Sequence, residues 1–210
     1  MKHFRTLIAA AALLVAFAAP SLADAEKFNI DNNHSVAGFQ VRHFFAKVPG
    51  RFNEMSGTIM YDAKNVANSS VDVTIPAATI NTQNERRDGH LKSADFFDVE
   101  KNPTITFKST KVIAGKTADK FQVEGDLTMR GVTKKVTLDV TQLGVGSMGR
   151  GVVGGWEATT TVNRKDFGIN WNRTLDQGGT LLGDDVTINL SIEANKDEPK
   201  KDAPPAATAK

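Results

Sequence analysis

Strict alternation of apolar and polar residues is the feature that most constrains how this chain folds. Val71, Val73 and Ile75 alternate with Asp72 and Thr74, and seven other segments share this period of two. Because successive side chains of a β-strand point to opposite faces, each segment predicts a strand with one buried face and one face in water. The eight strands are predicted around residues 39–43, 57–61, 71–75, 104–108, 121–129, 136–140, 156–162 and 186–192.

One segment between the third and fourth strands has a different period. Residues 85–93 carry Arg87, His90 and Leu91 at helical spacing, and the residues before them offer possible helix caps in Asn81, Thr82 and Asn84. No helical crossover of a dozen residues recurs between the strands, which excludes a parallel α/β sheet. The pattern predicts an all-β fold with one short helical insertion. The strands are expected to form a closed or nearly closed antiparallel barrel, because closure removes exposed edges. An eight-stranded barrel is either packed solid or holds one small ligand, and the pattern leaves both open.

The two ends of the chain are predicted to lie outside the barrel. Residues 1–23 combine Lys2 and Arg5 with an apolar run and small residues, as in a cleaved signal peptide, with cleavage after Ala23 or Ala25. The thirteen apolar residues of that run make a helix of about 20 Å, too short for a bilayer core of about 30 Å. Residues 195–210 are rich in Lys, Pro and Ala and predict a disordered tail. The predicted domain is 26–194.

Composition excludes several classes of function. The chain has no cysteine, so disulfide frameworks, thiolate metal sites and cysteine nucleophiles are excluded. It has 26 Lys and Arg against 24 Asp and Glu, which argues against a nucleic-acid partner. His34, His43 and His90 show no H-x-H or H-E-x-x-H spacing, so no metal site is predicted.

A dense charged cluster at residues 86–92 is the main candidate for chemistry. Asp88 and His90 are an acid and a base that a hydrolase or isomerase would use. No G-x-S-x-G nucleophile turn accompanies them. A solvated helix face is the favoured interpretation, and a cationic rim that receives a polar or phosphorylated head group is a third. We therefore expect no enzymatic activity.

Four blocks in a fixed order resemble a known family. They are His34-Ser35 leading to Phe39, Val41, Arg42 and His43; Arg87-Asp88-Gly89-His90-Leu91-Lys92-Ser93-Ala94-Asp95-Phe96-Phe97-Asp98 running on to Asn102-Pro103 and Phe107; Gly125-Asp126-Leu127-Thr128 with Gly131-Val132-Thr133-Lys134 and Val136; and Asn163-Arg164-Lys165-Asp166-Phe167-Gly168. Together they resemble the YceI-like family of bacterial lipocalin-like proteins, which are described as polyisoprenoid-binding and are usually exported to the periplasm. Gly89 and the bulky pair Phe44-Phe45 depart from the family pattern near the expected pocket mouth.

The resemblance implies an extended lipocalin-like barrel whose interior holds a long amphiphile. The ligand would be an isoprenoid quinone or a polyprenyl phosphate, held for transport, storage or sequestration in the periplasm, and no cofactor or reaction is implied. The alternatives are a stress-induced barrel that binds another amphiphile such as a fatty amide, a barrel packed solid, and the hydrolase that uses Asp88 and His90. A transient membrane contact and a homodimer stay open as further partners.

The predicted ligand-binding residues come from the inward faces of the strands and from the pocket mouth. The inward set is Phe39, Val41, Val73, Ile75, Phe107, Leu127, Met129 and Trp156, with Trp171 near one end. Arg42, Arg87 and His90 are the predicted head-group donors.

Overall fold

The computed structural model describes residues 25–147, 149, 151–176 and 178–197. The predicted signal peptide, and the predicted tail from residue 198 onward, lie outside the described residues. The last strand continues to Lys196, two residues beyond the predicted end of the domain. Within the described part of the chain, no helix is long and apolar enough to cross a membrane.

Eleven β-strands and one α-helix make up the described fold. The helix is α1 (Glu85–Lys92). In chain order the strands are β1 (Glu26–Ile30), β2 (Val36–His43), β3 (Ala46–Phe52), β4 (Ser56–Tyr61), β5 (Ser70–Pro76), β6 (Ile80–Asn81), β7 (Thr104–Ala114), β8 (Lys120–Met129), β9 (Val132–Ser147), β10 (Val152–Asn163) and β11 (Leu182–Lys196).

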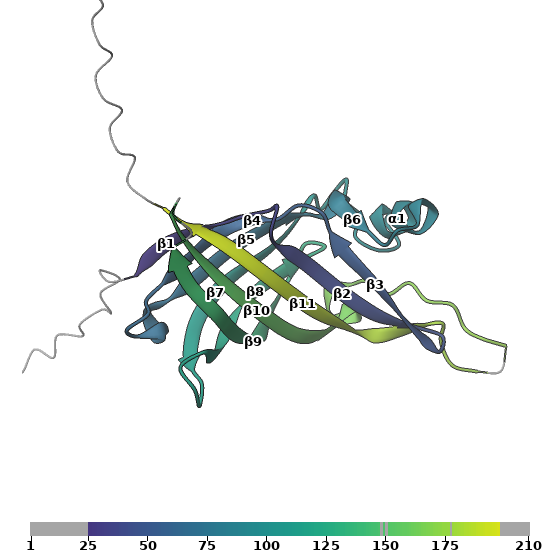
Figure 1. Ribbon diagram of the computed structural model, residues 1–210. Helices are drawn as coiled ribbons and strands as arrows, with labels where there is room; N and C mark the ends of the chain where they lie inside the picture. Colours follow the sequence, from purple (N-terminus) through teal and green to yellow (C-terminus); the bar gives the residue numbers. More distant parts are fainter. Residues whose placement is uncertain (1–24, 148, 150, 177, 198–210) are drawn as a thin grey trace, which may run out of the picture.

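Eight of these strands close into a barrel. Their order is β1–β4–β5–β7–β8–β9–β10–β11, and β1 pairs back onto β11. Every pairing in the ring is antiparallel. The prediction of a closed eight-stranded antiparallel barrel with one short helix is therefore confirmed. Figure 1 shows the ring as an elongated, strongly tilted barrel.

One strand of the ring differs from the sequence prediction. The first predicted strand corresponds to β2, which pairs with β11 from Leu182 to Ser191, while β1 pairs with β11 from Ala194 to Lys196. β1 carries only two large apolar residues, Phe28 and Ile30, so its alternation is too short to stand out. Strands β2, β3 and β6 continue the wall beyond the ring at the end that carries α1.

The two ends of helix α1 are defined by capping hydrogen bonds, and the helix has no buried face. The side chain of Asn84 accepts a hydrogen bond from the Arg87 amide at 2.9 Å, which satisfies one of the unpaired donors of the first turn. The helix ends at Ser93, whose amide donates to the His90 carbonyl. No residue of the helix is buried. Its position beside the barrel therefore depends on contacts made by individual side chains.

An aromatic cluster fills the barrel at the end opposite α1. Phe28 is completely buried, and its ring lies edge-on to Tyr61 and Trp156, with centroids 6.5 and 5.6 Å apart. The Tyr61 hydroxyl donates to the Gln142 side chain at 2.8 Å, so its polar atom is satisfied. We call Phe28, Tyr61 and Trp156 the aromatic end, and the region of α1 and the β2–β3 hairpin the helix end.

Candidate functional site: two adjoining apolar chambers

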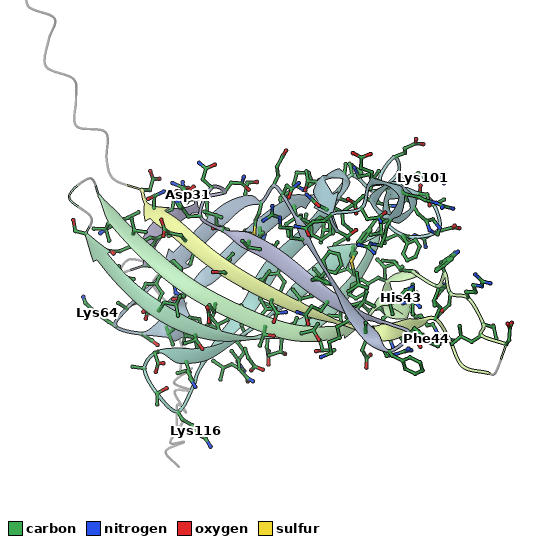
Figure 2. The ribbon with its side chains drawn as sticks, turned by 45° about the vertical axis from the view of Figure 1, so that its right-hand side comes forward. Asp31, His43, Phe44, Lys64, Lys101 and Lys116 are labelled. Carbon is green, nitrogen blue, oxygen red and sulfur yellow. The ribbon has the colours of Figure 1, made fainter. Side chains whose placement is uncertain are left out.

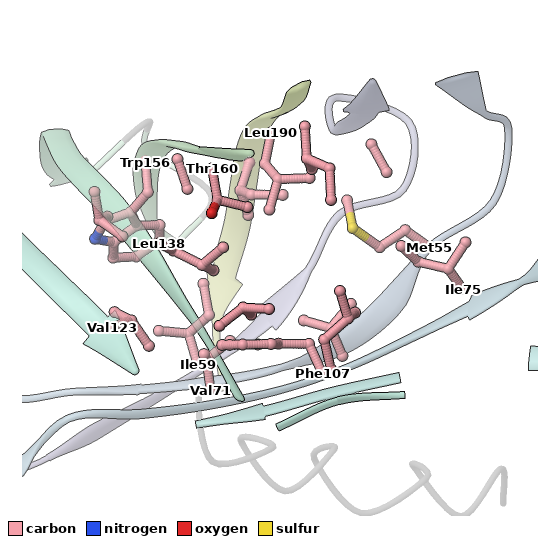
Figure 3. A pocket seen from close by; sticks show the side chains of 18 of the residues that line it. Met55, Ile59, Val71, Ile75, Phe107, Val123, Leu138, Trp156, Thr160 and Leu190 are labelled. Carbon is pink, nitrogen blue, oxygen red and sulfur yellow. The ribbon is translucent and has the colours of Figure 1, made fainter. Parts of the chain in front are cut away.

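The barrel encloses an inner chamber with a volume of about 170 Å³. Side chains from strands all round the barrel point into it, as Figure 3 shows for Ile59, Phe107, Leu138 and Leu190. Its lining is almost wholly apolar. A void needs about 10–15 Å³ to hold one water molecule, so the inner chamber is far larger than a packing defect. The alternative of a barrel packed solid by its own side chains does not describe this structure.

Seven of the predicted inward residues line the inner chamber. Phe107 of β7 pairs with Leu127 of β8 across the sheet, and Val73 of β5 pairs with Phe107 on the other side. The alternation that predicted the strands is the reason, because residues separated by two face the same side of the sheet. The seven are Phe39, Val73, Ile75, Phe107, Leu127, Met129 and Trp156.

A larger outer chamber, with a volume of about 530 Å³, adjoins the inner one at the helix end. The predicted residues Val41, Arg87, His90 and Trp171 line it, and Phe39 and Met129 line both chambers. Its wall includes His43, Thr82, Asn84, Arg86 and Arg164. Among the described residues, the arginines that line the cavity all lie at this end, whereas the inner chamber has only a few hydroxyl-bearing residues such as Thr160. The cavity therefore changes from apolar to polar along its length.

Four side chains mark the junction of the two chambers: Phe39, Phe52, Met129 and Ile188. The rings of Phe39 and Phe52 lie 5.8 Å apart, and Phe52 lies edge-on to Phe97 at 5.7 Å. Gly50 makes room for this arrangement, because a β-carbon there would collide with the ring of Phe39. Neither Phe52 nor Gly50 was predicted. The alternation of apolar and polar residues is weak around Phe52, because Pro49 and Gly50 interrupt it in β3.

Helix α1 presents one face to the outer chamber. Arg86, Arg87, His90 and Leu91 line that chamber, and they lie on one face because residues four apart on a helix are neighbours. Asp88 lies on the other face, away from the chamber. The helix thus divides the charged cluster into a cationic face toward the cavity and a face toward solvent.

Two of the predicted donors already have partners. Arg87 donates from Nε to the Thr82 hydroxyl and from Nη2 to the Thr82 carbonyl, each at 2.7 Å, which ties α1 to the preceding segment. His90 contacts the Asp95 carboxylate through Nε2 at 2.8 Å. Its ring lies edge-on to Phe96 and Trp171, with both centroids 5.0 Å away.

Arg86 belongs to the predicted charged cluster at residues 86–92 but was not among the predicted head-group donors. It is exposed at the wall of the outer chamber and has no hydrogen bond or ion pair with the residues that the structure describes. Its signal was present, since Arg86 and His90 are four residues apart and share a helix face. Arg86 is therefore the donor best placed to meet a ligand in the outer chamber.

Asp88 and His90 do not form the pair that a hydrolase would need. The Asp88 carboxylate accepts hydrogen bonds from both the amide and the hydroxyl of Thr82. His90 contacts Asp95 instead. Because the two side chains lie on different faces of α1, the structure gives them separate partners.

Arg42 lies outside both chambers. It alternates with Val41 on β2, so its side chain points to the outer surface. Its Nη1 donates to the Phe44 carbonyl at 3.0 Å and to the Thr180 carbonyl at 3.4 Å. Its position does not support the predicted role as a donor at the mouth, and the alternation of the strand already indicated this.

Arg164 is a buried cation that holds the segment carrying Trp171. It is 4% exposed and donates from Nη1 to the carbonyls of Ile169 and Trp171 at 2.7 and 2.8 Å. Its Nη2 lies 3.3 Å from the Asp184 carboxylate. Burial lowers the pKa of Arg164 and the nearby Asp184 charge partly opposes this effect. With its donors used in this way, Arg164 positions the wall of the outer chamber.

A second cluster of titratable groups lies at the turn between β1 and β2. His34 Nδ1 is 2.9 Å from Asp31 and 3.7 Å from Glu193. The hydrogen bond to His34 lowers the pKa of Asp31, and the same bond raises the pKa of His34. One ring nitrogen of His34 and one carboxylate oxygen each of Asp31 and Glu193 lie within 4.8 Å of one another. No local pattern reveals this cluster, because Glu193 comes from the last strand. We interpret the cluster as a polar staple between the turn and β11.

The chain is similar to proteins of known sequence and structure. A family model described as YceI-like domain matches residues 28–194. The UPF0312 protein SA2479 of Staphylococcus aureus (strain N315) is 38% identical over 173 residues, which cover 79% of this chain and 95% of the relative. A YceI protein of Campylobacter jejuni is 31% identical with a TM-score of 0.65, covering 73% of this chain and 88% of that one.

A more distant structure has the same fold. It is described as a polyisoprenoid binding domain from Saccharophagus degradans, with 14% identity, a TM-score of 0.57, and coverage of 81% of this chain and 98% of that one. At this identity the likeness concerns the fold alone. The family model, by contrast, spans nearly the whole barrel, from β1 to β11. This chain belongs to the YceI-like domain family.

Proposed function

We propose that this protein is an exported lipid-binding protein that holds an isoprenoid-type amphiphile in its two chambers. The observation that carries the proposal is the change along the cavity from an apolar inner chamber to an outer chamber with cations on one wall. An amphiphile with a long apolar tail and a polar head has the same change along its length. The predicted signal peptide at residues 1–23 supports a periplasmic location.

Burial of the tail supplies the affinity. Each buried CH₂ group contributes about 0.8 kcal/mol, and an isoprenoid tail needs no hydrogen bonds in return. The outer chamber alone falls within the range of about 300–1,000 Å³ that is usual for ligand pockets. The branched methyl groups of an isoprenoid suit a chamber walled by Val, Ile, Leu and Phe side chains. The Saccharophagus degradans domain of the same fold is described as polyisoprenoid binding, which supports the same ligand class.

The head group would lie against the cationic face of α1. Arg86 offers unused donors to a phosphate or to a quinone carbonyl, and both groups accept hydrogen bonds from a guanidinium. Arg87 and His90 keep the helix in place through Thr82 and Asp95. A phosphate would gain more from Arg86 than a neutral quinone, so the salt dependence of binding separates the two ligands.

Binding without catalysis is the simplest use of this site. The candidate acid and base Asp88 and His90 have separate partners, which argues against the hydrolase. A second candidate ligand is a fatty amide or similar amphiphile in a stress response, because an apolar chamber discriminates weakly between tails of similar width. The proposed physiological role is transport, storage or sequestration of the lipid between membranes.

Native mass spectrometry tests the proposal directly. The protein is purified from the periplasm without detergent, and any bound mass is extracted into organic solvent and identified. One isoprenoid quinone or polyprenyl phosphate per chain is the expected result, and a fatty amide would favour the second candidate. An apo protein that also refuses added polyprenols would overturn the proposal.

Replacement of Leu127 by Trp is expected to abolish lipid uptake, because the larger side chain fills the inner chamber where Leu127 faces Phe107. Overpacking of this kind costs about 1–3 kcal/mol of stability, so the barrel should still fold. Thr160→Phe, whose side chain also points into the inner chamber, is a second blocking variant. The matched control is Leu143→Trp, at a position 61% exposed. Unchanged lipid content in both folded blocking variants would contradict the proposed site.

A further inference from the structure

Two phenylalanines stand exposed at the tip of the β2–β3 hairpin. Phe45 is 90% exposed and Phe44 is 43% exposed, and their ring centroids lie 3.9 Å apart. Among the residues that the structure describes, the other exposed large hydrophobic side chains are Val36, Leu143 and Val145, all aliphatic. Single exposed apolar residues are ordinary, but two adjacent aromatic rings at one tip form an apolar projection that water solvates poorly.

The backbone at this tip is unfavourable for the residues it carries. His43 pairs with Ala46, so Phe44 and Phe45 form a two-residue turn. Phe44 has a φ of +53°, a conformation that suits glycine or asparagine and is uncommon for a bulky side chain. Two-residue hairpin turns favour Asn-Gly, Asp-Gly or Gly at the first position. The conformation of the turn therefore does not favour phenylalanine at these two positions, and neither ring is buried against the barrel.

The tip lies at the rim of the outer chamber. The Phe44 amide donates to the Leu181 carbonyl at 2.7 Å, and both Leu181 and the neighbouring His43 line the outer chamber. Figure 2 places Phe44 beside His43, at the end of the molecule farthest from Asp31. A surface that touches this tip is therefore next to the cavity at its polar, cationic end.

Three cations belong to the segments that form and adjoin the hairpin tip. Arg42 and Lys47 face each other across β2 and β3 next to the turn, and Arg173 is joined to Leu181 by a backbone hydrogen bond. None of the three has an ion pair with the residues that the structure describes. The Asp184 carboxylate near Arg42 is already paired with Lys165 at 2.9 Å and with Arg164. We call Phe44, Phe45, Arg42, Lys47 and Arg173 the hairpin collar.

We infer that the hairpin collar docks the protein on a bilayer that carries anionic lipid head groups, with Phe44 and Phe45 inserted at the interface. The inference rests on the proposed function, since docking here would place the outer chamber against the bilayer from which a lipid enters. Aromatic rings prefer the membrane interface, and basic residues beside them attract anionic head groups. A second copy of the chain fits the collar less well, because stable protein interfaces bury about 800 Å² on each partner and two rings offer far less.

Flotation with lipid vesicles tests the inference. Binding of the wild-type protein to vesicles of phosphatidylcholine with phosphatidylglycerol is compared with binding to phosphatidylcholine alone. All variants are purified identically from the cells that make them, and the N terminus of each is determined by mass spectrometry. The matched control is Leu143→Ser with Val145→Ser, since both residues are exposed on β9. Val145 pairs with Gly154, two residues from Trp156, which places the control at the aromatic end and away from the collar.

The double variant Phe44→Ser with Phe45→Ser is expected to lose vesicle binding by more than about tenfold, because two apolar rings no longer leave water. Lys47→Glu, which leaves both rings in place, is expected to lose about fivefold or more on anionic vesicles, and its loss should shrink at high salt. The Leu143 and Val145 control should bind as the wild type does. Equal vesicle binding by the wild type and both collar variants would overturn the inference, as would a wild type that binds neither vesicle.

A second measurement separates this inference from the proposed function. Binding of a short-chain, water-dispersed polyprenol is measured for the same variants without vesicles. Retained polyprenol binding by the collar variants with lost vesicle binding supports docking. If every variant binds polyprenol and vesicle binding is unchanged, docking is overturned and the proposed function stands. If the wild type does not bind polyprenol, the proposed function itself is contradicted. Concentration-dependent self-association that the collar variants lose would assign the collar to a dimer and would also overturn the inference.

Discussion

The chain has two tryptophans, and the barrel places one at each end. Trp156 at the aromatic end is 4% exposed and lies edge-on to Phe28 and Tyr61, each with its centroid 5.6 Å away. Trp171 at the helix end is only half-buried and lies 5.0 Å from the ring of His90. The first tryptophan comes from a strand of the ring, and the second from a segment that Arg164 holds.

The difference shows that one end of the barrel is tightly packed, which we call the firm end, whereas the other is less tightly packed and opens more readily, which we call the adaptable end. At the aromatic end, neighbouring strands of the ring form antiparallel ladders with one irregularity, a register shift between Gly155 and Trp156, and large rings fill the space between the strands. At the helix end, the wall is made by β2, β3, α1 and a connecting segment, and polar groups replace part of the apolar lining. Elements with few mutual contacts open more readily than a continuous ladder of strands. Ligand exchange is therefore expected at the helix end.

Truncation of the two tryptophans is expected to give the largest contrast. Trp156→Ala removes a fully buried ring from a filled cluster and should cost about 3–5 kcal/mol of unfolding free energy. Trp171→Ala removes a half-buried ring and should cost about 1–2 kcal/mol, while weakening polyprenol binding in the outer chamber. Urea unfolding and a polyprenol titration of both variants measure the two effects. Similar stability losses in the two variants would remove the distinction between a firm end and an adaptable end.

A smaller effect is expected at the junction between the chambers. Gly50→Ala forces the ring of Phe39 to move, because the new β-carbon would occupy the space of that ring. We expect a loss of about 1–3 kcal/mol in unfolding free energy and a change in the longest polyprenol that binds. Gly146→Ala is the matched control, because its β-carbon would meet no atom within 4 Å. Binding of the same range of chain lengths by Gly50→Ala and the control would show that Phe39 does not limit passage between the chambers.

The smallest effect is expected from the polar staple near the aromatic end. The hydrogen bond that His34 donates to the Asp31 carboxylate raises the pKa of His34, so the stabilisation that it provides is present below about pH 6.5 and is lost as the pH rises through the folded-state pKa. The lowered pKa of Asp31 has the opposite sign, so its contribution is lost only as the pH falls below about 3.9 toward the folded-state value.

Urea midpoints at pH 5.5 and 8.5 measure this dependence at low salt. The wild type should lose more stability than His34→Gln over this interval, and salt should reduce the difference because His34 is exposed. Asp31→Asn should remove the same difference, and the double variant should add nothing further. An equal loss in the wild type and in His34→Gln would show that the staple does not couple to folding.

The strands and most of the inner chamber were predictable because they follow a local rule. Residues such as Val73 and Leu127 alternate with polar neighbours, and that period alone assigns them to the inside. The same rule already placed Arg42 outside, although it was chosen as a donor for its charge. β1 was not predicted because five residues with two large apolar side chains carry too little of the pattern. Three residues were possible caps for the helix, and the structure selects the last of them, Asn84, so that α1 begins at Glu85.

The outer chamber depended on contacts that no local pattern encodes. Arg86 and His90 share a helix face by spacing, but only the docking of α1 decides that this face meets the cavity. Arg164 reaches Trp171 and Asp184 from a tight turn, and its burial follows from the path of the segment around it. The position of Phe44 and Phe45 at the chamber rim likewise required the pairing of β2 with β11 and the contact with Leu181.

The sequence by itself determined seven of the eight ring strands, the antiparallel barrel and most of the residues that face inward, because side-chain direction along a strand depends only on its period of two. Only the tertiary structure decided that the interior holds chambers and is not packed solid, and that cations line one end of them. The physical reason is that an enclosed volume depends on strand tilt, on stagger and on how facing side chains interdigitate across the barrel. These quantities are set jointly by residues far apart in the chain.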